Sequence, residues 1–345
     1  MRARRALFTL ALAALLGAAC APAPSVSAPS ATIGQATASP TPQPVKLSVA
    51  FSNITGDNLP LWFAAETGVA KANGLDLDVQ SVDGGSRTMA GLLANSYQMA
   101  QLGGSEVMSA VAGGEDLVVV GTLAPVYPYL FMARAEIKTA ADLKGKKVGI
   151  SSPGGSADIA TRIALRALGL DPDKDVIILP LGSHAQRSAA LFAGAIHAAV
   201  DDPPNTVELE ANGLHSLYDL AARKLPAAQT TLVAKRSFVG ANKDTVQRYV
   251  DTLVQSIATM KKDRAGTINV LKKFFKSSDE KAMGVAYDFF VNEVYQPYPY
   301  ATAEQFAEAL KELSKTNAKL VGFDVTKILD PSFVRSAEDR KVGAR

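Results

Sequence analysis

The chain has 345 residues, of which 48% are hydrophobic and 20% charged, and its formal net charge is +3. This composition excludes a disordered chain, and a single cysteine excludes a disulfide-stapled scaffold. Three arginines lie within the first five residues. Without them Lys and Arg number 33, equal to the 33 acidic residues. A near-neutral remainder argues against a nucleic-acid partner.

The first twenty residues have the pattern of an export signal. Arg2, Arg4 and Arg5 precede an apolar run at 6–16 and three small residues at 17–19. The run is too short to span a bilayer, so we predict a signal peptide over residues 1–19. Cys20 stands where a bacterial lipoprotein carries its lipidated thiol, although Gly17 replaces the usual leucine of that motif. We expect lipidation of Cys20, with cleavage to a free exported protein as the alternative.

A stretch of low complexity follows the cysteine. From residue 21 to 45 there is no charge, and nineteen of the twenty-five residues are Ala, Pro, Ser or Thr. Such a segment buries too little apolar surface to fold. We therefore predict a disordered, lipid-anchored tether over residues 20–45. The folded body begins near Lys46, and its length of about 300 residues is typical of two lobes.

Strand and helix patterns alternate through the first part of this body. Strands are predicted at 47–51, 75–82, 99–102 and 117–123, with helices at 59–68, 88–94 and 105–112 between them. The series restarts with strands at 146–151, 176–179 and 197–200, separated by helices at 157–168 and 185–192. Strict alternation predicts an α/β fold with parallel βα units.

An offset of 99 residues superimposes the two series. It places Val49 on Val148 and Phe51 on Ile150 without a gap. A constant offset over five elements indicates two copies of one unit. Two similar lobes create a cleft, which is where small ligands bind.

The C-terminal third is predicted to be helical. Apolar residues between 246 and 260 recur at steps of three and four, as in an amphipathic helix. Ser277 with Glu280, and Thr302 with Gln305, have the spacing of capping boxes. These helices are expected to contribute core surface.

Four segments carry a resemblance to a known family. They are residues 139–156, 83–95, 191–199 and 330–333. As a set they resemble solute-binding proteins of the nitrate/sulfonate/taurine class of ABC importers, the SsuA/THI5-like family with an NMT1-type domain. This class also covers binders of thiamine precursors.

The resemblance implies an architecture and a role. The implied fold is the type II periplasmic-binding-protein fold, in which the chain crosses between lobes twice, here near 127–134 and 230–236. Lobe 1 would comprise residues 46–130 and 235–345, and lobe 2 residues 131–234. The implied role is capture of a small-molecule solute by a monomer, without a cofactor, and its delivery to an ABC permease in the membrane.

Small polar turns after the predicted strands supply candidate ligand-binding residues. Glycines allow close approach to the backbone, and the free N–H groups of helix starts attract negatively charged oxygens. Turns at the carboxyl ends of parallel strands share one edge of the sheet. The candidates are Ser52, Asn53, Gly85, Ser86, Arg87, Gly104, Ser105, Ser152, Gly155, Ser156 and Asp202.

The identity of the solute stays open at this stage. Arg87 could add a fixed positive charge or be a solvated helix residue, and His184 lies at a turn that faces the expected cleft. Several acids in or beside the turns would suit a zwitterion or a nitrogen heterocycle better than a simple anion; they are Asp57, Glu106, Asp158, Asp201 and Asp202. A sulfonate, a carboxylate, a zwitterion and a pyrimidine all remain possible.

Sequence patterns of common enzymes are missing. The chain has no HExxH zinc pattern, no GxSxG elbow, no Walker loop and no dinucleotide GxGxxG. Pyrimidine synthases of thiamine metabolism resemble this family, but the cysteine cluster that they carry is absent. We therefore predict a protein that is not an enzyme and binds no metal. A pyrimidine-synthase-like enzyme and an exported sensor are the alternatives.

Overall fold

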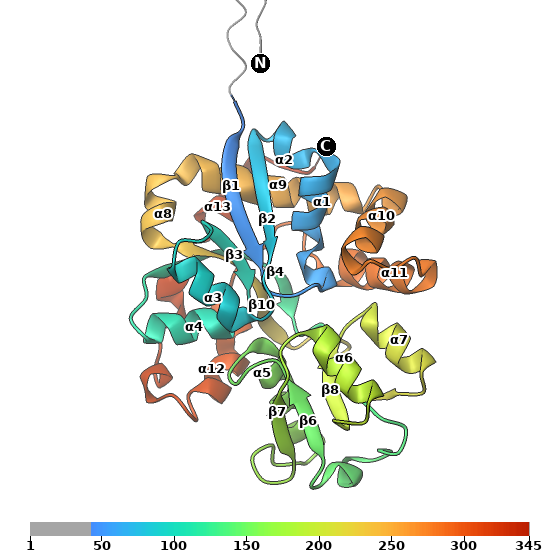
Figure 1. Ribbon diagram of the computed structural model, residues 1–345. Helices are drawn as coiled ribbons and strands as arrows, with labels where there is room; N and C mark the ends of the chain where they lie inside the picture. The colour runs from blue at the N-terminus through green and yellow to red at the C-terminus, as the bar shows by residue number, and fades with distance from the viewer. Residues whose placement is uncertain (1–42, 345) are drawn as a thin grey trace, which may run out of the picture. The chain divides into compact units, whose positions relative to one another are not determined.

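The computed structural model describes residues 43–344 (Figure 1). The predicted signal peptide and Cys20 lie outside the described residues, as does all but the end of the predicted tether. Within residues 43–344, none of the helices combines the length and the apolar character that crossing a bilayer requires.

The described chain forms two five-stranded sheets, each mixed in direction. The first has the order β2-β1-β3-β10-β4. Strands β1 and β2, and β1 and β3, pair in parallel, whereas β10 runs antiparallel to both β3 and β4. The bounds are β1 Val45–Phe51, β2 Leu75–Ser81, β3 Met99–Leu102, β4 Leu117–Val126 and β10 Pro226–Lys235. The predicted α/β class is confirmed.

The second sheet repeats this plan with the order β7-β6-β8-β5-β9. Strand β6 pairs in parallel with β7 and β8, and β5 runs antiparallel to β8 and β9. The bounds are β5 Leu130–Ala133, β6 Lys147–Ile150, β7 Ile177–Pro180, β8 Ala198–Asp201 and β9 His215–Asp219. We call the parts of the chain around the two sheets the first lobe and the second lobe.

The offset of 99 residues seen in the sequence holds in the structure. Helix α3 spans Gly85–Leu93 and α6 spans His184–Phe192, which differ by 99 at both ends. Strand β3 and strand β8 differ by the same number at both ends. The two sheets also share the strand order β2-β1-β3 and β7-β6-β8. The chain therefore contains two topologically equivalent βα units.

The chain passes from one sheet to the other twice. The first passage lies between β4 and β5, at residues 127–129, and the second between β9 and β10, at residues 220–225. The second passage comes earlier than the predicted 230–236. Grouping residues 131–234 with the second lobe was therefore wrong for β10, which belongs to the first sheet. This antiparallel strand is placed by partners more than a hundred residues away, and local sequence does not specify them.

Helices from both ends of the body cover the first sheet. Helix α1 (Leu59–Thr67) packs against α9 (Lys243–Met260) and α10 (Arg264–Phe275), as Figure 1 shows. Trp62 stacks on Phe274 with ring centroids 4.5 Å apart and meets Phe51 of β1 edge-on at 5.4 Å. Burying such rings is among the larger stabilising terms of a core. The C-terminal third thus returns to the first lobe.

A second apolar core joins the two lobes. It includes Leu102 of β3, Val148 of β6 and Phe306, all nearly inaccessible to solvent. The remaining α-helices of the described residues are α2 Val69–Ala72, α4 Gly104–Ala112, α5 Ser156–Ala167, α7 Asn205–Ala211, α8 Arg236–Ala241, α11 Glu280–Tyr287, α12 Ala307–Leu313 and α13 Ser332–Asp339.

One of the two predicted C-terminal capping boxes is present. Thr302 and Gln305 form the reciprocal pair at a short 3-10 helix, Ala303–Phe306. The box of Ser277 and Glu280 was wrong, because Asp279 is the residue that caps α11. Its carboxylate accepts a hydrogen bond from the Ala282 N–H at 2.9 Å. An aspartate immediately before a helix competes well with a serine two residues earlier.

Candidate functional site

A small polar cavity lies where the carboxyl ends of strands from both sheets meet. It encloses about 20 Å³, roughly the space that one water molecule needs. Its lining combines residues from both lobes. They are Ser52, Asn53, Thr55, Asp57, Gly85, Gly103, Glu106, Tyr129, Ser151, Ser156, Ala157, His184, Arg187, Gln229 and Thr230. The described lobes are therefore closed on each other.

The structure brings four of the eleven predicted ligand residues to this cavity. Ser52, Asn53, Gly85 and Ser156 line it, as does His184, which the sequence placed at the cleft. That any of them binds a solute stays a prediction.

Four other candidates make contacts beside the cavity. The hydroxyls of Ser86 and Ser152 lie 3.2 Å apart across the two lobes. Gly155 is the N-cap residue of α5, directly before Ser156. The Ser105 hydroxyl donates to Glu106 at 2.6 Å.

The remaining three candidates lie apart from the lining. Gly104 packs closely against Phe306 and Ala228, which favours a structural role for this glycine. Arg87 is exposed on α3, in agreement with the alternative of a solvated helix residue. Asp202 is fully buried, and its Oδ1 atom lies 3.6 Å from Nδ1 of the lining residue His184.

Several lining residues were not predicted as ligand contacts. Tyr129 ends the first passage between the sheets, whereas Gln229 lies on β10 just after the second passage. The Gln229 amide donates to the Tyr129 hydroxyl at 2.5 Å. Residues a hundred positions apart meet here only because of the strand order. Asp57 and Glu106 were noted as acids near the turns, but their burial had no signal in the sequence.

Asp57 is held by donors of its own lobe. Its carboxylate accepts hydrogen bonds from Thr230 at 2.5 Å, from Asn58 at 2.9 Å and from Thr55. Burial raises its pKa, and the hydrogen bonds from Thr230 and Thr55 oppose that rise only in part. The hydrogen bonds thus hold the carboxyl group in place at the cavity wall, and burial disfavours its charged form.

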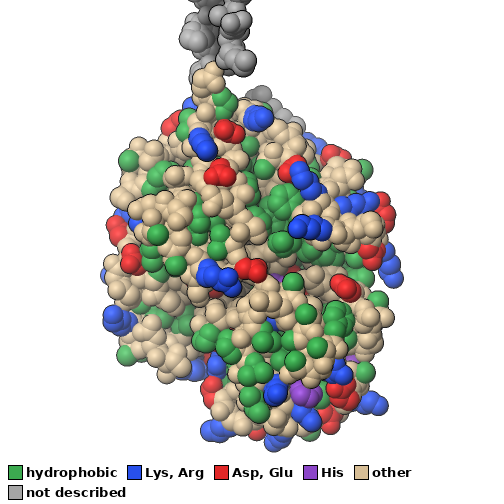
Figure 2. Space-filling model, viewed as in Figure 1, with side chains coloured by type: hydrophobic (Ala, Val, Ile, Leu, Met, Phe, Trp, Pro, Cys, Tyr) green, Lys and Arg blue, Asp and Glu red, His purple; other side chains and the backbone are tan. Residues whose placement is uncertain are grey.

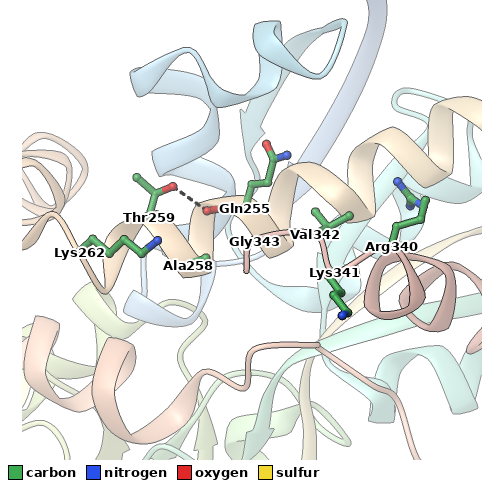
Figure 3. A pocket seen from close by; sticks show the side chains of 8 residues that line it. All are labelled: Gln255, Ala258, Thr259, Lys262, Arg340, Lys341, Val342 and Gly343. Atoms are coloured by element: carbon green, nitrogen blue, oxygen red, sulfur yellow. Dashed lines mark hydrogen bonds between the residues drawn. The ribbon is translucent and has the colours of Figure 1, made fainter. Parts of the chain in front are cut away.

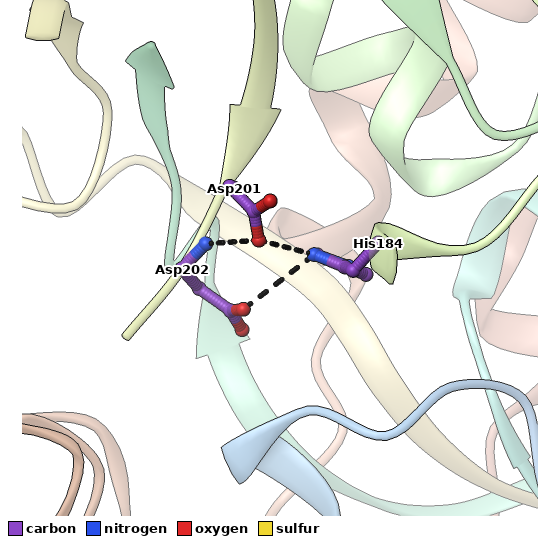
Figure 4. Close-up of side chains that lie close together, drawn as sticks. All are labelled: His184, Asp201 and Asp202. Atoms are coloured by element: carbon purple, nitrogen blue, oxygen red, sulfur yellow. Dashed lines mark hydrogen bonds and ion pairs between the residues drawn. The ribbon is translucent and has the colours of Figure 1, made fainter. Parts of the chain in front are cut away.

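The lining residue His184 lies next to two aspartates, Asp201 and Asp202 (Figure 4). The His184 Nδ1 atom lies 2.6 Å from Asp201 Oδ1 and 3.6 Å from Asp202 Oδ1. Asp201 also accepts hydrogen bonds from Ser188 at 2.9 Å and from Asn205 at 3.0 Å. Although burial alone would raise it, the pKa of Asp201 is lowered by His184, by Arg187 and by the hydrogen bond from Asn205.

The two neighbouring aspartates differ in their surroundings. Both carboxyl oxygens of Asp202 are buried and accept no hydrogen bond from the described residues. Burial, followed by repulsion from Asp201 and Asp57, raises the pKa of Asp202 well above its usual value. The pKa values of these two neighbouring aspartates are therefore shifted in opposite directions.

Arg187 supplies a buried positive charge next to this group. It is fully inaccessible, and its Nη1 donates to the Gly182 carbonyl at 2.7 Å. Its Nε is buried without a hydrogen-bond partner among the described residues. Tyr129 completes the wall, and burial together with Asp202 and Asp57 raises its pKa. Its hydroxyl therefore stays protonated at neutral pH.

His184, Asp201 and Asp202 are the described residues that come nearest to a metal site, with ligand atoms within 4.8 Å of one another. The distance of 2.6 Å between His184 Nδ1 and Asp201 Oδ1 is that of a direct hydrogen bond. Two ligands bonded to one zinc ion at about 2.1 Å each stand farther apart than this. The geometry fits a hydrogen-bonded pair better than a metal cage.

A larger cavity, of about 340 Å³, lies between α9 and the segment that follows α13 (Figure 3). Some of its polar side chains are already engaged within the protein. Arg340 makes a bidentate pair with Asp251 at 2.6 and 2.7 Å, and the Thr259 hydroxyl donates to the Gln255 carbonyl. It is lined by residues of the first lobe only, so it lacks the meeting of two lobes that distinguishes the polar cavity.

One face of the surface shows how the charged side chains are distributed. On the face drawn in Figure 2, acidic and basic side chains are interspersed rather than gathered by sign. A nucleic-acid interface needs a basic patch. The expected absence of a nucleic-acid partner stays a prediction.

Comparison with known proteins gives a consistent result. The family model described as NMT1/THI5 like matches residues 56–265. A Bacillus subtilis (strain 168) protein, provisionally named binding protein YtlA, is 23% identical over 268 residues, covering 76% of this chain and 80% of that protein. A structure from Bordetella bronchiseptica RB50 is 23% identical with a TM-score of 0.72, covering 86% of this chain and 98% of that one.

A second similar structure is that of a protein with a named ligand class. The alkanesulfonate-binding protein SsuA from Xanthomonas axonopodis pv. citri, bound to MOPS, is 20% identical with a TM-score of 0.68, covering 86% of this chain and 98% of that one. The type II periplasmic-binding-protein fold expected from the sequence is confirmed by this likeness. Since the family model spans more than half of the sequence, the chain belongs to the NMT1/THI5-like family.

Proposed function

We propose that this protein is an extracytoplasmic solute-binding protein that captures a small molecule between its two lobes and delivers it to an ABC importer. The observation that carries the proposal is the cavity at the strand ends, which is lined from both lobes by hydroxyl, amide, imidazole, guanidinium and carboxyl groups. Such convergent polar groups at the sheet edge are typical of ligand sites in α/β folds.

Binding requires the lobes to separate. The closed cavity of about 20 Å³ is too small for a solute of several heavy atoms. The two passages at 127–129 and 220–225 link the sheets and provide the hinge. Closure of two lobes around a ligand by bending of a few connecting residues is a common motion. The closed, solute-loaded form would be the one that a membrane permease recognises.

We infer that the solute carries hydrogen-bond donors on nitrogen, as a zwitterion or a nitrogen heterocycle does. Four carboxyl groups surround the cavity and its wall, whereas His184 and Arg187 are the basic groups of that region; the carboxyl groups are Asp57, Glu106, Asp201 and Asp202. The carboxyl groups of Asp57 and Glu106, which belong to the lining itself, disfavour a simple sulfonate. A protein of this kind releases its solute unchanged and is no enzyme.

The N-terminal sequence supports a location outside the cytoplasm. Removal of residues 1–19 and lipidation of Cys20 would leave the folded body on a tether at the membrane, close to the permease. The protein would act as a monomer, with the solute and the permease as its partners.

A thermal-shift screen of the exported protein tests this function. The panel contains alkanesulfonates, carboxylates, zwitterionic amino acids and aminopyrimidines. A ligand at one hundred times its Kd stabilises the folded state by about 2.7 kcal/mol. We expect a hit among the nitrogen-containing solutes, which mass spectrometry should recover unchanged. Conversion of the hit to product would refute a pure binding role, and a hit confined to alkanesulfonates would refute the inferred solute class.

A further inference from the structure

Three helices direct their N-termini at one point beside the cavity. They are α3, α4 and α5, with the N-cap residues Gly84, Gly103 and Gly155. None of the three has a side-chain cap, because glycine offers no acceptor. Helices α3 and α4 belong to the first lobe and α5 to the second. Three uncapped helix starts create a strong preference for a negatively charged oxygen.

The carboxyl group of Glu106 occupies that point. Ideal Cβ positions built on Gly85 and Gly103 lie 2.2 Å and 2.4 Å from its two oxygens, and one built on Gly155 lies 3.1 Å away. The Ser105 hydroxyl donates to it at 2.6 Å from the same helix. Burial raises the pKa of Glu106, and the polar groups of Ser105 and of Ser156, which comes from the other lobe, oppose that rise only in part.

The glycines make this arrangement possible. A side chain at Gly85 or Gly103 would overlap the Glu106 carboxyl group, since both distances lie far below van der Waals contact. The glycine turns, which the sequence suggested as seats for a solute's oxyanion, therefore enclose an acid of the protein itself.

We propose that Glu106 is a specificity-determining residue, whose carboxyl group fills the oxyanion position formed by the three helix starts and so excludes free sulfonates and carboxylates from it. This inference deepens the proposed function and rests on it for its biological meaning. It makes a separate physical claim, namely that removing the side chain exposes an anion site, and this claim can be tested without knowing the natural solute.

The test uses methanesulfonate and acetate as probes. The full-length protein, Glu106→Ala and Glu115→Ala are compared by calorimetric titration and by thermal shift in each anion. Glu115 is an exposed acid just beyond the other end of α4, so its variant has the same change in net charge without altering the helix starts. Glu106→Ser is a second variant that shortens the side chain.

We expect Glu106→Ala to bind methanesulfonate about tenfold to a hundredfold more tightly than the other two proteins, the range given by one hydrogen bond to a charged group. If Glu106→Ala folds only in the presence of methanesulfonate, that dependence also shows binding of the anion and supports the proposal. Equal weak binding by all three proteins, tight binding by the unaltered protein, or failure of both Glu106 variants to fold even in the probe would overturn the proposal.

These outcomes are independent of the solute screen. If the screen finds no solute while Glu106→Ala gains the anion, the proposed function fails and the role of Glu106 stands. If the screen succeeds and the variant gains nothing, only the role of Glu106 fails.

Discussion

Asp202 allows a sharp test of the electrostatics of the site. Its carboxyl group is fully buried, accepts no hydrogen bond from the described residues, and lies near two other carboxyl groups. Burial and these neighbours raise its pKa well above the usual value. The replacement Asp202→Asn keeps the size of the side chain but removes its titration.

The sign of the effect follows from linkage. An acid with a raised pKa contributes stability fully below its pKa in the unfolded chain, about 3.9, and loses it as the pH rises through the folded value. Asparagine cannot ionise, so the variant does not undergo this loss. Each unit of pKa elevation corresponds to about 1.36 kcal/mol, or roughly 2–4 °C in melting temperature for a protein of this size.

The measurement is a series of thermal melts from pH 4 to pH 8. The melting temperature of Asp202→Asn minus that of the unaltered protein should grow steadily with pH. Asp76→Asn, at an exposed aspartate of β2, is the matched control and should show no such trend. A difference that is constant across the range would refute the reasoning, because a lost contact has no pH dependence of this kind.

Three further predictions concern closure, binding and anchoring. Gly103→Ala should enlarge the radius of gyration in X-ray scattering, because its Cβ would lie 2.0 Å from the Ser156 hydroxyl of the other lobe; an unchanged radius would contradict this. Ser156→Ala should weaken binding of the screened solute about tenfold with little change in melting temperature, since this hydroxyl is no cap of α5, whereas a stability loss near 1 kcal/mol with unchanged affinity would show a cap. Cys20→Ala should move the protein from the membrane fraction to the soluble exported fraction, and a soluble unaltered protein would exclude lipidation.

Local patterns in the sequence were sufficient for the repeated βα units. The helix predicted at 185–192 is observed at 184–192, and the strand predicted at 99–102 is observed at those residues. Alternation of apolar residues and glycine turns depends on neighbours in the chain, so it can be interpreted without a structure. The constant offset of 99 residues gave the relation between the two units.

Non-local arrangements could not be predicted. Strand β5 has four residues and lies between β8 and β9, which pair with it from more than sixty positions away. Glu106 shows the same limit within the site. The sequence placed it beside a glycine turn, but its contacts with α3 and α5 depend on two other segments and on closure of the lobes. The glycine turns alone predict a site for a negatively charged ligand, whereas in the structure a carboxyl group of the protein occupies that position.

An ion pair also connects the two lobes. Arg166 of α5 contacts Glu312 of α12 at 2.5 Å, and Lys315 contacts the same carboxylate at 2.7 Å from its own lobe. Glu312 is only 6% exposed, so it needs a positive partner in either state, and Lys315 provides one when the lobes separate. Loss of Arg166 should therefore affect closure much more than folding.

Arg166→Ala and Glu312→Gln should each increase the radius of gyration of the unliganded protein, while the double variant should increase it no further. A cross-lobe pair of this exposure contributes about 0.2–1 kcal/mol, or up to about a fivefold change in the ratio of closed to open protein. Arg162→Ala, one turn earlier on α5 and paired with Asp158 and Asp173 of its own lobe, is the control and should leave the radius unchanged. Additive effects in the double variant would show that the two residues act independently, and the pair would then have no part in closure.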